Sequence, residues 1–454
     1  MNRLVLIIAL LIASGLRMTA GNHDTRRAEL RDSILSLVTG AAEPGGKAVD
    51  ITRLGARGDG VRDCRKAFDK AMRMADRKGG LRITVPAGTY FIKGPLTLTS
   101  NVEIELQEGA TLKFSPDPAD YPIVSTSWEG TYLWNYSPMI YGYGLKNVTI
   151  KGRGTIDGNA MTTFATWKKY QRAAKQRSRT MNHTEVPLDR RRFGDGDWLR
   201  PHLLQLYRCS GVTIEGVKIT NSPFWCIHLL QSDNIICRGL RYDAKLINND
   251  GIDPESSRNI LIEDIDFDNG DDNIAIKSGR DNDGRNVAIP SENIVIRNCR
   301  FKGLHAVVIG SEMSGGVRNV IIENCTYGGY CKRGIYVKTN PDRGGFVTGL
   351  WVKNCTFGDV EDLFYVTSCY AGEGMDNVHY STIADIHVDS LACRRASAAA
   401  LVLQGTRPRP ITDVSFTNVS VDSARIGISF SDTRNVTLGN CFIGGRVTVP
   451  SQAH

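Results

Sequence analysis

The sequence has little of what marks a metalloprotein, a membrane protein or a nucleic-acid-binding protein. It contains 11 cysteines and 8 histidines in 454 residues, but no Cys-x-x-Cys pair and no Cys/His cluster with the spacing of a zinc site. Beyond the N-terminus, no stretch approaches the roughly 20 apolar residues that a transmembrane helix needs. The 56 basic and 48 acidic side chains are interspersed, whereas a nucleic-acid-binding protein clusters its positive charge. We therefore expect no metal, no cofactor, no membrane span and no nucleic-acid partner.

The first residues have the pattern of a secretory signal peptide. A basic residue, Arg3, precedes the apolar run Leu4–Ile12, and residues 18–20 supply a small-residue cleavage position. The apolar run is too short to span a bilayer, and a buried N-terminal helix is the alternative interpretation. The pattern predicts a signal peptide over residues 1–20 and an exported protein, periplasmic or extracellular, formed by residues 21–454.

A short pattern recurs along the chain and predicts its architecture. Each copy begins with an anchor residue, usually Asn, and continues with alternating apolar positions, as in "NVTIKG" and "NILIEDIDF". From Gly211 onward the copies follow at intervals of 22 to 36 residues, separated by Gly-, Asn- and Asp-rich turns. Strands repeated in this way indicate a solenoid of stacked coils. The anchors are Asn101, Asn147, Gly211, Asn234, Asn259, Asn293, Asn319, Gly349, Asp385, Asp413 and Asn435.

The sixth residue after each anchor tests this interpretation. From Gly211 onward this residue is apolar in every copy, as an interior column of stacked coils requires. The column is Val217, Leu240, Ile265, Cys299, Cys325, Cys355, Leu391, Val419 and Cys441. Cysteine behaves there as a small hydrophobic residue, so these cysteines are interpreted as core rather than as disulfides or metal ligands. The pattern predicts an all-β fold, a single right-handed parallel β-helix.

The N-terminal end of such a stack needs a cap, because an open end exposes an unpaired strand edge. The segment "DCRKAFDKAMRMADRKGG" supplies one, since its apolar residues recur at helical spacing and the glycine pair at its end stops a helix. These apolar residues are Ala67, Phe68, Ala71, Met72 and Ala75. We expect an N-terminal capping helix within a cap at about residues 49–80.

The densest acidic segment suggests a catalytic site. Asp250 lies in the turn before one expected strand, and Asp271 and Asp272 lie in the turn before the next, 21 residues later. Because stacked coils are about 4.8 Å apart, the carboxyl groups are expected about 5–10 Å from one another. Crowded carboxylates repel, which raises at least one pKa and leaves a protonated acid beside an ionised base. This arrangement suits glycoside hydrolysis, while calcium ligation or a solvated acidic turn is the alternative.

The acidic segment belongs to a set of motifs that are specific in combination. It reads "NND", "GIDP", "GDD" and "NIAIKSG" between residues 248 and 279. Further motifs are "LGARGDGVRDCRKAFDKAM", "VPAGTYFIKGPLTL", "GRGTIDG", "RPHLLQLYRCSGVTIEGVKITNSPFW" and "IGSEMSGGVRNV". Together they resemble glycoside hydrolase family 28, the polygalacturonases and related pectin hydrolases, and in particular its bacterial exo-acting members. The resemblance covers nearly all of the chain after the predicted signal peptide.

The resemblance implies a role for each matching residue. Asp271 would protonate the glycosidic oxygen as general acid, while Asp250 and Asp272 would hold and deprotonate the attacking water. The anomeric configuration would be inverted, without a covalent intermediate and without a metal. Asp253 and Asn248 would contact the sugar at the cleavage point.

The chain departs from the family at its expected Gly-His-Gly motif. The corresponding segment reads Leu304-His305-Ala306. His305 is assigned the role of the family's histidine. In another register the expected histidine falls on Leu304, and His305 is then an incidental turn residue.

The expected Arg-x-Lys motif is also changed. It reads Tyr336-Val337-Lys338, so Lys338 is available for a substrate carboxylate, but Tyr336 cannot form the bidentate clamp of a guanidinium. Arg333 either compensates for the missing arginine or caps a turn, and Tyr370 matches the family's expected tyrosine. A branched or alternating pectin, such as rhamnogalacturonan, is therefore a candidate substrate beside homogalacturonan.

A basic insertion separates two anchors. Asn147 and Gly211 are 64 residues apart, far more than one coil. The surplus, at about residues 165–197, is expected to wall off one end of the groove, attract polyanionic pectin and favour removal of terminal sugars; a solvated basic face is the alternative. Its basic residues are Lys168, Lys169, Arg172, Lys175, Arg177, Arg179, Arg190, Arg191 and Arg192.

Taken together, the sequence predicts a monomeric inverting hydrolase that cleaves α-galacturonosyl linkages of an acidic pectic polysaccharide or oligosaccharide from a chain end. Two alternatives are a calcium-dependent β-helix pectate lyase and a non-catalytic carbohydrate-binding β-helix. The expected catalytic residues are Asp250, Asp271, Asp272 and His305. The expected substrate-binding residues are Asn248, Asp253, Arg333, Tyr336, Lys338 and Tyr370.

Overall fold

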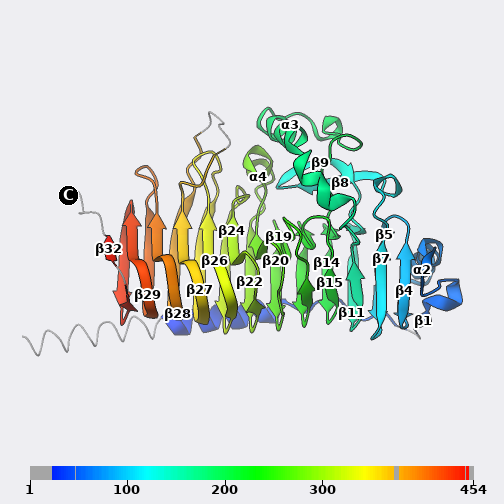
Figure 1. Cartoon of the computed structure of the whole chain (residues 1–454), viewed down its shortest axis with the longest axis horizontal. Helices are drawn as coiled ribbons and strands as arrows, with labels where there is room; N and C mark the ends of the chain where they lie inside the picture. The colour runs from blue at the N-terminus through cyan, green and yellow to red at the C-terminus, as the bar shows by residue number, and fades with distance from the viewer. Residues whose placement is uncertain (1–22, 46–47, 373–377, 445, 449–454) are drawn as a thin grey trace, which may run out of the picture.

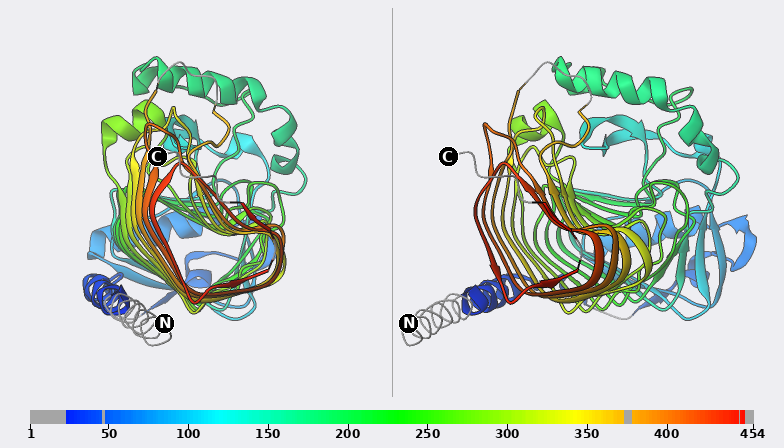
Figure 2. Two further views of the ribbon diagram at one scale, coloured as in Figure 1. Left: turned by 90° about the vertical axis from the view of Figure 1, so that its left-hand side faces the viewer. Right: turned by 60° about the vertical axis from the view of Figure 1, so that its left-hand side comes forward.

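The computed structural model describes residues 23–45, 48–372, 378–444 and 446–448. Its strands pair in parallel, coil after coil, and form one long rod (Figure 1) whose cross-section is visible along the axis (Figure 2). The predicted right-handed parallel β-helix is confirmed. The predicted signal peptide lies outside the described residues, and no described helix has the length and hydropathy of a membrane span.

Three runs of parallel strands form the sides of the rod. The first run, which we call the anchor face, has strands that begin at or near the anchors: β1 (Val49–Asp50), β3 (Leu81–Val85), β6 (Val102–Leu106), β11 (Lys146–Gly152), β14 (Ser210–Glu215), β17 (Asp233–Arg238), β20 (Arg258–Glu263), β22 (Ser291–Arg297), β25 (Val317–Glu323) and β30 (Thr433–Gly439). The second run, the groove face, comprises β5 (Leu96–Thr97), β10 (Ile140–Tyr143), β13 (Leu204–Tyr207), β16 (Ile227–Leu230), β19 (Ile252–Glu255), β21 (Asp272–Ile276), β24 (His305–Gly310) and β32 (Arg446–Thr448).

The third run comprises β2 (Asp59–Asp63), β4 (Gly88–Ile92), β7 (Ala110–Phe114), β12 (Thr155–Asp157), β15 (Lys218–Thr220), β18 (Arg241–Asp243), β23 (Arg300–Phe301) and β31 (Phe442–Ile443). Longer strands bend from one side to the next in the C-terminal coils: β26 (Thr326–Lys338), β27 (Phe346–Thr367), β28 (Thr382–Gln404) and β29 (Ile411–Ser431).

The anchor residues share one backbone conformation. All of them have a positive φ, between 52° at Asn435 and 71° at Gly211. Gly, Asn and Asp tolerate this left-handed region better than other residues, which explains why the anchors are restricted to these types. Neighbouring anchors also bond: Asn293 Nδ2 donates to Asn259 Oδ1, and Asn319 Nδ2 donates to Asn293 Oδ1, each at 3.0 Å. The anchors therefore fix where each coil turns and how it aligns with the next.

The predicted interior column is present. The backbone register pairs Cys355 with Leu391 and Leu391 with Val419, and the column is buried except at the partly exposed Cys441. All 11 cysteines are free thiols, in agreement with the interpretation of these residues as core.

The predicted N-terminal capping helix is α2 (Arg65–Lys78). Its five predicted apolar residues are the buried ones, and Gly79 ends the helix with φ 73°. Short 3₁₀ helices lie nearby and in the loops: η1 (Ile51–Leu54), η2 (Pro118–Asp120), η3 (Phe164–Lys169) and η4 (Leu188–Arg190).

A second helix, over residues 23–37, was not predicted. It lies along the outside of the anchor face, where Ile34 is 1% exposed. Its apolar side chains recur every four residues, at Leu30, Ile34 and Val38, which is the signal that sequence reading could have used. It packs against Ile236, Leu261, Val295, Ile321 and Trp351.

A wall of inserted elements covers part of the groove face. The basic insertion folds largely as a helix, α3 (Arg172–His183), and lies beside a two-stranded antiparallel hairpin of β8 (Ile123–Trp128) and β9 (Thr131–Tyr136). Figure 1 shows the hairpin and α3 on one side of the rod, with α4 (Asp281–Val287) beside them. Sequence analysis predicted a wall at the insertion but did not predict the hairpin.

We predict that Ile34→Ala releases the N-terminal helix. Deleting this buried side chain is expected to cost about 2–5 kcal/mol, because it leaves a cavity against the anchor face. Hydrogen exchange of residues 23–37 should accelerate strongly. Leu37→Ala, at a side chain that is 51% exposed on the same helix, is the control and should change exchange little. Equal exchange in the two variants would contradict the packing described here.

Candidate active site

The candidate site lies on the outer surface of the groove face, where residues from successive coils form a column. The register pairs Asp272 of β21 with His305 of β24, His305 with Arg333 of β26, and Arg333 with Asp362 of β27. These residues are far apart in the sequence but only one coil apart in space. His305 therefore lies in a strand and faces the acidic cluster, not in an incidental turn.

Asp271 is held by the turn that precedes β19. The backbone N–H and the side-chain Nδ2 of Asn248 both lie 3.3 Å from Asp271 Oδ2. The backbone N–H of Asp272 donates to Asp271 Oδ1 at 3.1 Å. Asn248 is held in turn, because its Oδ1 accepts from Arg200 at 2.7 Å and from Lys168 at 3.1 Å. The orientation of the Asp271 carboxyl group is thus set by several neighbours.

Asp271 and Asp272 have opposite pKa shifts. Burial, followed by the charge of Asp272, raises the pKa of Asp271. Burial would also raise the pKa of Asp272, but Lys338 and His305 outweigh it and hold that pKa below its ordinary value. Lys338 Nζ lies 3.3 Å from Asp272 Oδ2, and His305 Nδ1 lies 2.5 Å from Oδ1. The pair therefore combines a proton donor with an ionised acceptor.

Asp250 and Asp253 form a second carboxyl pair around Lys277. Lys277 Nζ lies 3.8 Å from Asp250 Oδ2 and 3.6 Å from Asp253 Oδ1. Burial and the neighbouring carboxylate raise the pKa of Asp250, and burial raises the pKa of Asp253 although Lys277 opposes it. The resemblance implied an ionised Asp250, but these shifts make Asp272 the stronger candidate for the base.

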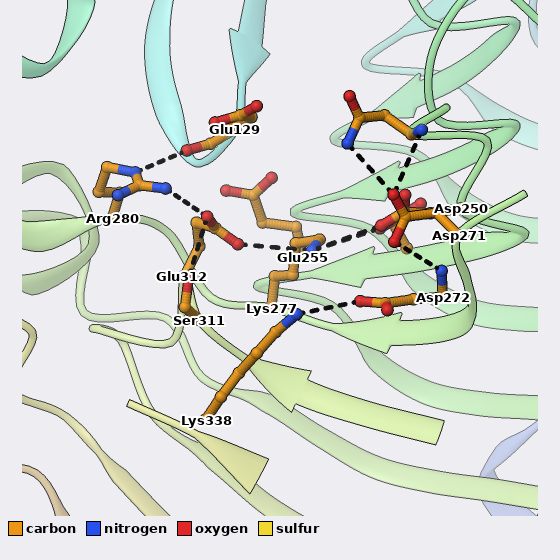
Figure 3. Close-up of polar contacts among 12 residues, drawn as sticks. Glu129, Asp250, Glu255, Asp271, Asp272, Lys277, Arg280, Ser311, Glu312 and Lys338 are labelled. Atoms are coloured by element: carbon orange, nitrogen blue, oxygen red, sulfur yellow. Dashed lines mark hydrogen bonds and ion pairs between the residues drawn. The ribbon is translucent and has the colours of Figure 1, made fainter. Parts of the chain in front are cut away.

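Charges of alternating sign connect the carboxyl pair around Lys277 to the tip of the hairpin (Figure 3). Lys277 Nζ lies 3.4 Å from Glu312 Oε2, and Glu312 pairs with Arg280. Arg280 Nε donates to the backbone oxygen of Glu129, between β8 and β9, at 2.9 Å. The carboxylates and the hairpin are therefore parts of one buried network.

A buried imidazole and carboxyl group lie beside Lys277. His228 Nε2 donates to Glu255 Oε2 at 2.7 Å, while its Nδ1 accepts from Gln205 at 2.9 Å. Burial raises the pKa of Glu255 to about 8 and lowers the pKa of His228 to about 3, so both groups are neutral near neutral pH. Within the described chain, Glu255 Oε1 is buried and has no hydrogen-bond partner, so in the neutral carboxyl group its O–H can donate a hydrogen bond to a ligand.

The remaining predicted residues lie on the other side of His305. The ring of Tyr336 is 5.5 Å from the ring of His305, and Lys338 Nζ is 5.9 Å from the ring centre of Tyr370. Arg333 lies in a strand and does not cap a turn. Its guanidinium carbon is 4.6 Å from the Tyr336 ring centre, and its Nε is 3.1 Å from Asp362 Oδ2. Its charge is therefore already balanced by a carboxylate.

One group in the site has spacing compatible with a metal ion. Ligand atoms of Asp271, Asp272 and His305 all lie within 4.8 Å of one another. The Lys338 ammonium is already paired with Asp272 and would compete with a cation for this carboxylate. The expectation of a metal-free site stays a prediction.

Sequence reasoning missed several of these residues. Lys277 and Glu312 both lie inside the quoted motifs "NIAIKSG" and "IGSEMSGGVRNV", so a signal was present. Their pairing depends on which side chains point out of adjacent strands, which a motif does not state. Glu129 lies in the unpredicted hairpin, between β8 and β9, and Arg280 directly precedes α4.

Comparison with known proteins shows the family of the chain. The family model described as "Glycosyl hydrolases family 28" matches residues 77–442. A solved structure of a hyperthermoactive exopolygalacturonase from Thermotoga maritima is 34% identical, with a TM-score of 0.82, over 92% of this chain and 96% of that one. A probable polygalacturonase from Vitis vinifera is 28% identical over 92% of this chain and 82% of its own length. An exo-poly-alpha-D-galacturonosidase from Dickeya chrysanthemi is 26% identical over 90% and 76%.

We predict that Lys338→Met destabilises the protein in a pH-dependent way. The pKa of Asp272 is lower in the folded chain than in the unfolded chain, so its ionisation stabilises the fold above the ordinary carboxyl pKa and this contribution is lost as the pH falls through the folded value. Removing the ammonium should cost about 3 kcal/mol at pH 7, because it leaves a buried carboxylate without its lysine partner. The difference in Tm between wild type and variant should shrink as the pH is lowered below about 4.

Lys302→Met is the matched control. Lys302 Nζ lies 3.0 Å from Asp268, but its side chain is 64% exposed, so its removal should change Tm little at any pH. A Lys338→Met loss that stayed constant with pH would contradict the assigned coupling to Asp272.

Proposed function

The chain belongs to glycosyl hydrolases family 28 and is a polygalacturonase-like glycoside hydrolase, and from this premise we propose that it removes terminal galacturonate from pectic oligosaccharides with inversion. Pectic galacturonan is the substrate class of the family. The finer substrate is a galacturonan or rhamnogalacturonan-type oligosaccharide. The observation that carries the proposal is the pair of adjacent carboxyl groups with opposite pKa shifts on the side of the rod that also carries the hairpin and α3.

The proposed reaction uses Asp271 as the general acid. Its raised pKa keeps a proton available, and this proton passes to the oxygen of the leaving sugar as the glycosidic bond breaks. Asp272, ionised beside Lys338 and His305, takes a proton from a water molecule that attacks the anomeric carbon from the opposite face. Asp250 helps to hold this water. One direct displacement of this kind inverts the anomeric centre.

The wall supports action at a chain end. Glu129 at the hairpin tip pairs with Lys175 at 2.9 Å and with Arg179, both on α3, in addition to the contact of its backbone with Arg280. Arg191 further fixes the wall, because its Nη1 lies 2.6 Å from an oxygen of Asp283 in α4. Breaking buried ion pairs of this kind is costly, so we expect the hairpin to be a fixed barrier beside the catalytic carboxyl groups. A long chain cannot continue past it, and a terminal sugar can fill the space in front of it.

The residues on the opposite side of the site would determine which second sugar the enzyme accepts next to the cleaved bond. Lys338 is the predicted contact for a substrate carboxylate, but it is paired with Asp272, and Arg333 is paired with Asp362. Tyr336, which is buried, replaces the expected arginine and supplies no second cation. A neutral sugar next to the cleaved bond is therefore tolerated, which supports rhamnogalacturonan-type oligosaccharides as substrates.

We also propose that the enzyme acts outside the cytoplasm, as a monomer. The support is the signal-peptide pattern of residues 1–20 and the chemistry of the substrate, since pectin is an extracellular polymer. Enzyme recovered from a secreting host should begin near residue 21, and N-terminal sequencing of that protein tests the assignment.

We predict that the first products from oligogalacturonates are monomers with the β configuration. Chromatography of early digests should show galacturonate from the beginning, and NMR should detect the β anomer before mutarotation. A set of rhamnogalacturonan oligosaccharides with terminal galacturonate should be cut as well. A ladder of medium-sized products would contradict exo action, an initial α anomer would contradict inversion, and unsaturated products that disappear with a chelator would indicate a lyase.

We predict that Asp271→Asn lowers kcat by about 10²–10⁴-fold, because the amide cannot donate the catalytic proton. Binding of an oligosaccharide, measured by calorimetry, should remain. The control is Asp243→Asn, at a carboxylate whose side chain is 53% exposed on the third side of the rod. Unchanged turnover in Asp271→Asn would support a non-catalytic carbohydrate-binding protein or a different acid.

A further inference from the structure

Lys168 is an ammonium group with unused hydrogen-bonding capacity at the edge of the site. It lies in η3, within the basic insertion, and its side chain reaches the turn that holds the catalytic acid. Its Nζ donates to Asn248 Oδ1 at 3.1 Å, and Asn248 itself contacts Asp271. An ammonium has three N–H donors, and this contact uses one of them.

The other lysines around the site are already neutralised by carboxylates. Lys175 pairs with Glu129, Lys277 lies between three carboxyl groups, and Lys338 pairs with Asp272. Lys168 differs from them, because its hydrogen-bond partner in the described chain is a neutral amide.

Arg200 reaches the same amide but cannot serve an external ligand. It is 0% exposed, and its guanidinium donates to Gln171, to the backbone oxygens of Pro223 and Ile247, and to Asn248. Its contacts hold the turn in place. Lys168 is only partly buried, so its ammonium is less completely enclosed than the guanidinium of Arg200.

The surroundings of Lys168 define where a ligand would bind. Burial lowers the pKa of Lys168, while the charges of Glu129 and Asp271 oppose this shift. The ammonium is therefore influenced by both the hairpin tip and the catalytic acid, which bound the space in front of the wall. A partly dehydrated cation in such a place gains most from an anionic partner.

We propose that Lys168 binds the carboxylate of the terminal galacturonate, the sugar that is released, and so selects an acidic over a neutral terminal sugar. The proposal rests on the proposed function, since it assigns the recognition of the sugar on the walled side of the cleaved bond. It gives the basic insertion a specific role: one of its lysines contributes directly to the site, while Lys175, Arg179 and Arg191 hold the wall.

The test compares Lys168→Met with Lys169→Met. The two lysines are adjacent, but Lys169 is exposed and its Nζ lies over the ring of Tyr170, 4.8 Å from the ring centre. For each variant, kcat and KM are measured with digalacturonate and with its derivative methyl-esterified on the non-reducing residue. Competitive inhibition by galacturonate and by galactose is measured in parallel, because galactose lacks the carboxylate.

Lys168→Met should weaken kcat/KM for digalacturonate and inhibition by galacturonate by about 10- to 100-fold, the value of a lost charge-assisted hydrogen bond. The methyl ester and galactose should be affected much less, so that the preference for the acid collapses. Lys169→Met should behave as wild type. Lys168→Arg, which keeps the charge, should recover part of the preference.

An equal loss for the acid and the ester would overturn the proposal, because it would show that Lys168 only orients Asn248 and the catalytic acid. Unchanged kinetics would overturn it as well. Failure of the proposed function is distinguishable, since wild type would then release no galacturonate from any of these substrates.

Discussion

Parallel backbone pairing between successive coils is the constraint on which the whole site depends. Its spacing of about 4.8 Å places Asp272, His305 and Arg333 in one column, although long and unequal loops separate them in the sequence. The left-handed anchors keep this register, because each marks the same point of its coil and several are bonded to the next. Loops of any length can therefore be added between strands without displacing the catalytic column.

Burial of several carboxyl groups creates the electrostatic problem that the surrounding cations solve. The pKa of Asp272 is lowered by Lys338 and His305, while burial and the charge of Asp272 raise the pKa of Asp271. Lys277 contacts the second carboxyl pair, and its contact with Glu312 extends the network of charges toward the wall. The same type of contact thus sets the protonation of the acid and base and fixes the barrier that shapes the groove.

Much of the fold could be read from the sequence, because a repeating strand leaves a period of two and a stacked column leaves an apolar residue at a constant offset. The capping helix and the proximity of Asp250 and Asp271 followed from the same kind of pattern. The hairpin could not be read in this way, because β8 and β9 pair locally and carry no anchor. The pairing of Lys277 with Glu312 and the raised pKa of Asp250 depend on burial and side-chain direction, which strand patterns do not encode.

The interior cysteines have a consequence for how the chain matures. Cys299, Cys325 and Cys355 occupy the same position in three successive coils and remain reduced. Hydrogen bonding between neighbouring thiols, together with burial, raises the pKa of Cys325 and Cys355, so in the folded rod these two thiols rarely form the thiolate that disulfide chemistry requires. An exported chain has no such protection before its coils stack. For the enzyme exported as proposed, maturation in an oxidising compartment would be a competition between coil assembly and thiol cross-linking.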